Sequence, residues 1–324
     1  MCALGFYEFI NRNERKKVEI TFLGTGAGVP SRSRNVTSIM LKLLDESNEM
    51  WMFDCGEATQ HQIMKTTLKP RKVTKIFITH LHGDHIFGLP GFLSSRSHQG
   101  GESAVTIYGP KGIKAYIENF LQVTRTSLGY DLIIHELADE GIVFQNDQYQ
   151  VIYKTLDHAI QSYGYRVIEA DQVGELLIDK ARAAGVPNGP LLGQLKQGKT
   201  ITLDDGRQLN GQDFIGPDIK GRIITILGDT RYHRNAVALA KDADILVHEA
   251  TFAEGEERMA RNYYHSTAKQ AGLVAKEASV KQLLLTHISA RYVGKTSQQL
   301  EADAKKIFHN SHIVKDFDSI NLGK

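Results

Sequence analysis

The chain has 324 residues, of which 39 are Lys or Arg and 37 are Asp or Glu, so its formal net charge is only +2. This length suits one large α/β domain or two smaller ones, and no apolar stretch approaches the roughly 20 residues that a membrane span needs. The balanced charge identifies no nucleic-acid binder, so such a partner would have to be held by local patches. The two cysteines, Cys2 and Cys55, argue against a disulfide framework and favour a reducing cytoplasm.

Alternation and apolar runs predict the elements of the first half of the chain. Residues 1–17 mix apolar and charged groups, so they do not resemble a signal peptide and form a lead-in of unknown role. We expect strands at 18–23, 37–44, 50–53, 75–78, 104–108, 132–136, 142–144, 149–155 and 162–169, and helices at 58–65, 87–97 and 113–123. A basic loop at 69–72 precedes the strand at 75–78.

The second half is interrupted between residues 171 and 220. This stretch holds one predicted helix, 176–184, then a break at 185–190 and a remainder rich in Gly, Gln, Lys and Asp. We expect such an insertion to bury little of its own surface, which predicts an arm that projects from the domain 18–324; an ordinary irregular connection is the alternative. Regular order resumes with strands at 222–227, 244–247 and 282–285 and helices at 267–278 and 297–308.

A histidine-rich string follows the apolar strand at 75–78. Two imidazoles, His80 and His82, are followed by Asp84 and His85, and imidazole nitrogens and carboxylate oxygens are ligands that Zn²⁺ takes at about 2.0–2.2 Å. Gly83 would permit the sharp bend that turns them inward. A His-rich surface loop is the alternative, but the whole string behind a hydrophobic strand favours a metal site.

Five predicted strands end in an acidic residue or a histidine, at Asp54, His80, Asp229, His248 and His287. Open sheets place their sites beyond the carboxyl ends of strands, so these side chains should converge on one edge.

Four ligands from one loop cannot comfortably surround a single tetrahedral ion, so two ions about 3.5–4 Å apart are the better interpretation. The first ion would take His80, His82 and a later histidine, and the second Asp84, His85 and another. Asp229, after the small Gly228, suits the bridging position. The best remaining histidines by strand-end position are His158 and His287, whereas we expect surface or packing roles for His61, His98, His135, His233 and His312.

Several motifs together resemble the metallo-β-lactamase superfamily, and most closely its tRNA 3′-processing branch, the ribonuclease Z family. The resemblance runs in order from about residue 18 to 322. It rests on Gly24-Thr25-Gly26, Asp54-Cys55-Gly56-Glu57, the His80 to His85 string, Phe87-Gly88-Leu89-Pro90-Gly91, His158, Gly228-Asp229-Thr230, His248-Glu249-Ala250-Thr251-Phe252, His265-Ser266-Thr267 and Thr286-His287-Ile288-Ser289-Ala290-Arg291-Tyr292.

The resemblance implies a four-layer αββα sandwich with two Zn²⁺ ions per subunit. One ion would be held by His80, His82, His158 and Asp229, and the other by Asp84, His85, Asp229 and His287. It also implies cleavage of precursor tRNA after the discriminator nucleotide, leaving a tRNA 3′-hydroxyl and a trailer 5′-phosphate. A homodimer without a membrane partner is expected.

The same resemblance suggests roles for residues around the metals. Asp84 would accept a proton from the attacking water, and His265, oriented by Glu249, would protonate the leaving oxygen; a purely structural carboxylate is the alternative for Glu249. Phosphates would meet Arg32, Arg34, Lys69, Arg71 and Lys72, and the arm would act as a tRNA-binding exosite with Gly189-Pro190 near its tip and Lys180, Arg182, Lys196 and Lys199 on the tRNA body.

Two rival interpretations stay open at this level. A small-molecule hydrolase of the same fold, such as a β-lactamase, thioesterase or general phosphodiesterase, would not need the arm. A zinc-dependent binding protein without turnover is the other rival, but a closed structural site would leave no position for water.

Overall fold

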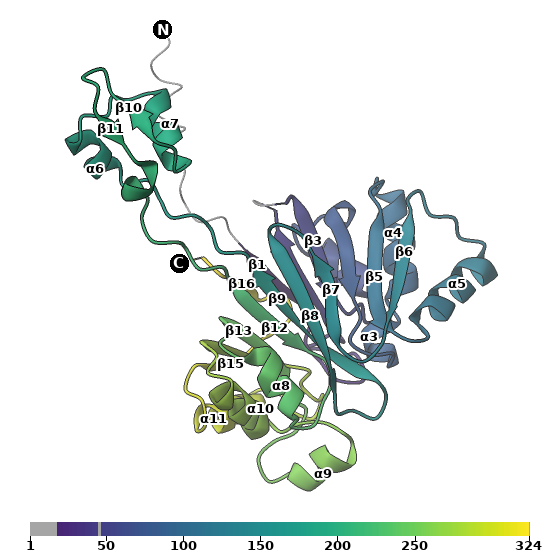
Figure 1. Ribbon diagram of the computed structural model, residues 1–324. Helices are drawn as coiled ribbons and strands as arrows, with labels where there is room; N and C mark the ends of the chain where they lie inside the picture. Colours follow the sequence, from purple (N-terminus) through teal and green to yellow (C-terminus); the bar gives the residue numbers. More distant parts are fainter. Residues whose placement is uncertain (1–17, 45–46, 324) are drawn as a thin grey trace. The chain divides into compact units, whose positions relative to one another are not determined.

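The computed structural model describes residues 18–44 and 47–323, which form two compact units (Figure 1). The main unit comprises the described residues within 18–145, 151–167 and 223–323, and the inserted unit comprises 146–150 and 168–222. The predicted lead-in 1–17 lies outside the described residues. Within the described part, every helix is too short or too polar to cross a membrane.

The first sheet of the main unit joins both ends of the described chain. Its strand order is β16-β1-β2-β3-β4-β5-β6. Strands β16, β1, β2 and β3 pair antiparallel, whereas β3, β4, β5 and β6 pair parallel. Their bounds are β1 Glu19–Gly24, β2 Ser38–Leu43, β3 Glu49–Phe53, β4 Val73–Phe77, β5 Val105–Pro110, β6 Leu132–Leu137 and β16 Ser319–Asn321.

The second sheet has the strand order β15-β14-β13-β12-β9-β8-β7. Strands β12 to β15 pair parallel, so their carboxyl ends share one edge. The bounds are β7 Gly141–Gln145, β8 Tyr149–Leu156, β9 Ser162–Glu169, β12 Ile223–Leu227, β13 Ile245–Glu249, β14 Gln282–Thr286 and β15 Ser311–Ile313.

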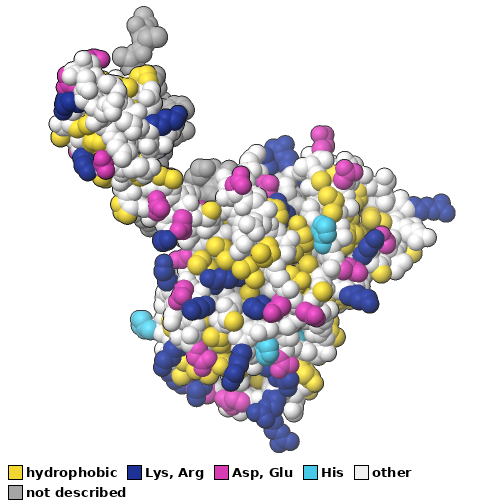
Figure 2. All heavy atoms as spheres, viewed as in Figure 1, with side chains coloured by type: hydrophobic (Ala, Val, Ile, Leu, Met, Phe, Trp, Pro, Cys, Tyr) yellow, Lys and Arg dark blue, Asp and Glu magenta, His cyan; other side chains and the backbone are white. Residues whose placement is uncertain are grey.

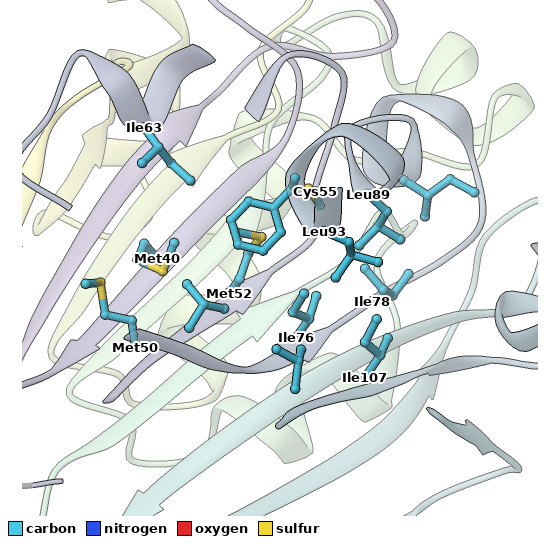
Figure 3. Packing of buried hydrophobic residues seen from close by; sticks show 14 of the residues in the cluster. Met40, Met50, Met52, Cys55, Ile63, Ile76, Ile78, Leu89, Leu93 and Ile107 are labelled. Atoms are coloured by element: carbon cyan, nitrogen blue, oxygen red, sulfur yellow. The ribbon is translucent and has the colours of Figure 1, made fainter. Parts of the chain in front are cut away.

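The two sheets face each other through aromatic side chains, and helices cover their outer faces. Successive residues of a strand point to opposite faces. Accordingly Met52 packs in the cluster under the helices (Figure 3), whereas its neighbour Phe53 stacks on Phe77, and both rings approach Tyr165 of the second sheet. Helices α2 Thr59–Met64, α4 Leu89–His98 and α5 Ile113–Thr124 cover the first sheet. Helices α8 Arg234–Ala240, α10 Ala268–Glu277 and α11 Lys295–Lys305 cover the second. The predicted four-layer αββα sandwich is confirmed.

Several short elements were not predicted from the sequence. Helix α9, Glu257–Asn262, buries only Ala260, so it has no apolar periodicity to detect. Helix α8 begins after the cap residue His233, and no apolar run precedes it. Strands β15 and β16 span three residues each, which is too short for an alternating pattern to be recognised. Within the basic loop, Pro70–Lys72 form a 3₁₀ turn, η1, and the histidine string ends in a four-residue helix, α3 Gly83–Ile86.

The inserted unit builds a small hydrophobic core of its own, which corrects the expectation that this stretch buries little surface. It contains α6 Ile178–Ala183, α7 Pro190–Lys196, β10 Ile201–Thr202, β11 Gln208–Leu209 and the 3₁₀ turn η2 Gly211–Phe214. Their buried side chains are Ala181, Val186, Leu192, Leu195, Ile201, Leu203 and Phe214. The sequence hid this core because these residues are scattered singly among polar ones.

Candidate metal centre

The histidine string lies beyond β4, as predicted. His80 and His82 belong to the loop, whereas Asp84 and His85 lie on α3, so a single helical turn presents both of the later ligands. Gly83 does not adopt the left-handed conformation; a Cβ atom there would lie 2.2 Å from a ring carbon of Phe87. A larger residue at this position would therefore require the exposed Phe87 ring to move, and the bend expected at Gly83 does not use a left-handed conformation.

A first ligand group joins the string to the end of β8. Ligand atoms of His80, His82 and His158 all lie within 4.8 Å of one another. The His158 Nε2 atom is 3.2 Å from His82 Nδ1, and His80 Nε2 is 3.6 Å from Asp229 Oδ2.

A second ligand group comprises Asp84, His85, Asp229 and His287. The Oδ2 atom of Asp229 lies 3.5 Å from His85 Nε2 and 3.2 Å from His287 Nε2. Asp84 Oδ2 lies 3.5 Å from His85 Nε2 and 3.3 Å from His287 Nε2. Because Asp229 Oδ2 also approaches His80 of the first group, it occupies the position from which one carboxylate could bridge two ions.

The donor set fits metal binding. The Nε2 atoms of His80 and His85 are buried and have no hydrogen-bond partner among residues 18–44 and 47–323, although buried polar atoms are nearly always paired. Imidazole and carboxylate groups without thiolates are suited to Zn²⁺ and related divalent ions. The centre is thus a candidate metal site with more than one group of possible ligands.

The charged and ionisable groups of the centre shift one another's pKa values. Burial lowers the pKa of His80 well below its usual value, and the neighbouring His85 lowers it further. Burial also opposes protonation of His85, yet Asp229 and Asp54 hold its pKa well above the ordinary range. Burial would raise the pKa of Asp84, but a hydrogen bond with His287 and the nearby His85 ring bring it far below normal. A neutral His80 and an ionised Asp84 are the protonation states that a metal ion requires.

Two residues to which the sequence analysis gave no role, Asp54 and Thr79, contact the ring nitrogens of His85 and His80 that face away from the candidate metal site. Asp54 Oδ2 lies 2.7 Å from His85 Nδ1, and Asp54 also accepts hydrogen bonds from the Thr79 amide and hydroxyl at 2.7 and 2.8 Å. The Thr79 hydroxyl lies 3.0 Å from His80 Nδ1. Such partners fix the tautomer and direction of a ligating imidazole. The strand-end position of Asp54 was the signal for it; Thr79 gave none.

The remaining ligands are oriented in the same way. The Thr251 hydroxyl lies 2.9 Å from His287 Nδ1, and the Tyr264 carbonyl oxygen lies 2.8 Å from His158 Nδ1. The Gly28 amide donates to Asp84 Oδ2 at 2.8 Å, which places the glycine-rich turn after β1 beside the centre.

A histidine–glutamate pair adjoins both ligand groups. His265 Nδ1 lies 2.8 Å from Glu249 Oε1 and 3.9 Å from Asp229 Oδ2. Glu249 is buried and also accepts from the Thr230 amide at 3.0 Å and the Thr251 hydroxyl at 2.5 Å. Burial alone would lower the pKa of His265, but the charge of Glu249 raises it to about 9. With Nδ1 held by Glu249, Nε2 is the ring nitrogen left to face a substrate.

Other strand-end and histidine positions lie apart from this centre. His248 is buried, with Nδ1 2.8 Å from the Glu249 carbonyl oxygen, so β13 presents Glu249 rather than His248 to the site. His233 caps α8, and His135 stacks on Tyr108.

The predicted RNA-binding residues differ in exposure. Arg34 is only 7% exposed and donates hydrogen bonds to the Thr25 hydroxyl and the Val314 carbonyl oxygen, so the structure favours a role in fixing the loop over a phosphate contact. Arg32, Lys69 and Arg71 are exposed and Lys72 is half-buried. On the face that Figure 2 shows, Lys and Arg are interspersed with Asp and Glu over the main unit.

The predicted tRNA-binding residues of the inserted unit also differ in their exposure and in their partners. Lys180, Arg182, Lys196 and Lys199 are exposed, as is Pro190, whereas Gly189 is half-buried. Lys180 donates to the Asp213 carbonyl oxygen and lies over the Phe214 ring.

The fold and the paired His/Asp groups define this chain as a metallo-β-lactamase-fold protein with a candidate metal centre. A family model described as anti-Pycsar protein Apyc1 matches residues 18–164.

A curated protein named Ribonuclease Z from Pediococcus pentosaceus is 61% identical over 305 residues, which cover 94% of this chain and 99% of the relative. Its namesake from Ligilactobacillus salivarius is 59% identical over 307 residues, covering 94% and 97%. The crystal structure of human tRNase Z, short form, matches with a TM-score of 0.68 and 31% identity over 93% of this chain and 98% of that chain. The chain belongs to the ribonuclease Z family.

Proposed function

We propose that this protein is a zinc-dependent endoribonuclease that cuts precursor tRNA on the 3′ side of the discriminator nucleotide. The products are a tRNA with a 3′-hydroxyl and a trailer with a 5′-phosphate. The observation that carries the proposal is that Asp229 Oδ2, a member of the second ligand group, also lies 3.6 Å from His80 of the first, with the His265–Glu249 pair beside it. Membership of the ribonuclease Z family supports the same substrate.

Seven side chains would hold two Zn²⁺ ions in each subunit. We assign His80, His82, His158 and Asp229 to one ion and Asp84, His85, Asp229 and His287 to the other, following the two geometric groups. Bound zinc would lower the pKa of water toward about 7 and so supply a nucleophile at neutral pH.

The chain's own residues then move two protons. Asp84 orients the attacking water through Oδ2, which the Gly28 amide also contacts, and accepts its proton. The water oxygen bonds to phosphorus as the bond from phosphorus to O3′ of the discriminator breaks. His265 donates the proton on Nε2 to that O3′ atom, while Glu249 holds Nδ1 and stabilises the cationic ring before transfer.

Substrate grip would come from individual exposed cations rather than from net charge. Between residues 171 and 220 the sequence has seven acidic and six basic residues, and Arg207 and Lys220 are paired with Asp205 and Asp171. We therefore assign the phosphate contacts of this exosite arm mainly to Arg182, Lys196 and Lys199. In the main unit, Arg32, Lys69, Arg71 and Lys72 would contact phosphates, and Arg34 would position their loop.

A homodimer and a cytoplasmic location complete the proposal. The reducing environment that suits a chain with two cysteines is the compartment in which precursor tRNA would be met. Sedimentation of the purified protein with and without tRNA would test the dimer.

The test is to map the cut made by the purified full chain in a precursor tRNA with a labelled trailer. We expect one cut after the discriminator, a 5′-phosphate on the trailer, loss of cleavage with a chelator and recovery on adding Zn²⁺. Hydrolysis of bis(p-nitrophenyl) phosphate is the matched assay for chemistry without tRNA. Rapid hydrolysis of this ester with no cleavage of precursor tRNA would contradict the proposal and favour a small-molecule phosphodiesterase.

A further inference from the structure

A pocket of about 250 Å³ lies beside the metal centre in the main unit. Its lining residues are Asp157, Arg231, Tyr232, Arg261, His265 and Gln270. The volume lies below the roughly 300–1,000 Å³ typical of sites for drug-sized ligands. A pocket of this size suits a small ligand group, and His265 is shared between it and the proposed catalytic site.

One wall of the pocket is a fixed, flat cation. The Arg231 guanidinium makes two hydrogen bonds to the Asp157 carboxylate, each 2.9 Å long, and lies 4.3 Å from the ring centroid of Tyr264. The Arg231 side chain is still 32% exposed. A guanidinium held in one plane is a surface on which an unpaired RNA base can stack.

The pocket lining also offers unpaired donors. Arg261 is exposed, and its side chain has no hydrogen bond or ion pair in the described part of the chain. Gln270 accepts from the Thr267 amide through Oε1, which leaves its Nε2 group as a donor. Because Asp157 neutralises Arg231, Arg261 supplies the uncompensated positive charge. A flat stacking surface together with one free cation matches a nucleotide, which has a planar base and a phosphate.

We infer that this pocket holds the last nucleotide retained by the tRNA, with its base on Arg231 and its 5′-side phosphate at Arg261. This inference rests on the proposed function. His265 delivers its proton to the O3′ atom of the retained nucleotide, so the ribose that carries O3′ must lie against His265. The pocket that shares His265 is therefore on the leaving-group side of the scissile phosphate, and it receives the discriminator rather than the first trailer nucleotide.

The first experiment measures kcat/KM for the full-length Arg231→Ala variant on three precursor tRNAs. One is unmodified, one has an abasic discriminator and one has an abasic first trailer nucleotide. A stacking contact is worth about 1–3 kcal/mol, or roughly a 5- to 150-fold change. We expect a loss in this range on the unmodified and trailer-abasic substrates and no further loss on the discriminator-abasic one. Equal losses on all three substrates would overturn the inference.

The second experiment uses Arg261→Ala, which removes an exposed side chain with no hydrogen bond or ion pair among the described residues and so should fold. Arg258→Ala, an exposed change on the same helix α9, is its control. We expect a loss of about tenfold for Arg261→Ala on the unmodified substrate, in line with a hydrogen bond to a charged group. That loss should vanish when the phosphate 5′ to the discriminator is a neutral methylphosphonate. Persistence of the loss on the neutral substrate would contradict the assignment.

Wild-type controls separate the two levels of inference. If the wild-type protein does not cut precursor tRNA at all, the proposed function fails. If it cuts correctly but the two variants show no dependence on the discriminator base or its phosphate, only the pocket assignment fails.

Discussion

The metal centre and the inserted unit use polar side chains in opposite ways. In the centre, charged groups are buried, and His80, His85 and His287 each have a second residue that fixes the ring nitrogen facing away from the metal position. In the inserted unit, the interior is apolar and Arg182, Lys196 and Lys199 are exposed. We therefore propose that the chemistry depends on positions fixed by hydrogen bonds, whereas tRNA recognition by the inserted unit requires only that its small core keeps cations on the surface.

The largest expected effect is at Asp229. If the metal centre tolerated the loss of this buried charge, it would not differ from the inserted unit in its dependence on fixed polar groups. Asp229→Asn should reduce both precursor tRNA cleavage and ester hydrolysis by more than the roughly 10–100-fold that loss of an outer partner of a metal ligand costs. Metal content measured by atomic absorption should fall with activity. An active variant with its full metal content would contradict the bridging role.

His265→Ala should have the next largest effect, and it should depend on the leaving group. Loss of a general acid typically costs about 100–10,000-fold, so we expect that range for precursor tRNA, whose leaving oxygen needs a proton. Hydrolysis of bis(p-nitrophenyl) phosphate should fall far less, because p-nitrophenolate leaves without one. Equal loss on both substrates would reject the acid role.

Leu195→Ala tests the inserted unit separately. Leu195 is fully buried in its small core, and such a truncation typically costs about 2–5 kcal/mol. We expect earlier proteolytic cleavage within residues 168–222 and a fall of more than tenfold in precursor tRNA cleavage, with ester hydrolysis retained. Leu191→Ala, at a half-buried position of the same helix α7, is the milder control. An equal loss of both activities would contradict the proposal that the inserted unit acts in tRNA binding and the main unit in the chemistry.

The smallest expected effect is a shift in pH dependence. The charge of Glu249 raises the pKa of His265 to about 9, and the acid acts only while protonated, so cleavage should decline as the pH rises through that pKa. Glu249→Gln removes the charge and lowers the pKa, so the decline should begin at lower pH. Rate profiles under single-turnover conditions, from pH 6 to 10, measure the shift. An unmoved alkaline limb would assign Glu249 a purely structural role.

The sequence predicted features that depend on neighbouring residues and missed contacts between residues that lie far apart in the chain. The apolar strand before His80 and the strand-end position of Asp229 can be recognised from neighbouring residues, and the structure brings them together. Thr251 belongs to a recognised motif, but its role could not be assigned because its partner, His287, is 36 residues away. The sequence predicts an RNA contact for Arg34 because nothing in it shows that Val314, 280 residues later, accepts a hydrogen bond from this side chain.

The same limit applies to the inserted unit, where buried residues such as Val186 and Phe214 do not follow a single helical or strand period. Its role as a tRNA-binding arm, like the two zinc ions, the homodimer and the cytoplasmic location, stays a prediction.

The backbone at Asp54 and His287 restricts which residues can replace them. Asp54 directly follows β3 and His287 directly follows β14, and both have left-handed φ angles, 57° and 55°. Asp, Asn and His enter this region far more readily than β-branched residues, for which it is a genuine outlier. Both positions are therefore closed to Val, Ile and Thr, even though such residues are common in the strands before them. Asn is consequently the substitution of choice at either position, because it removes the ionisable group while retaining a side chain that this conformation tolerates.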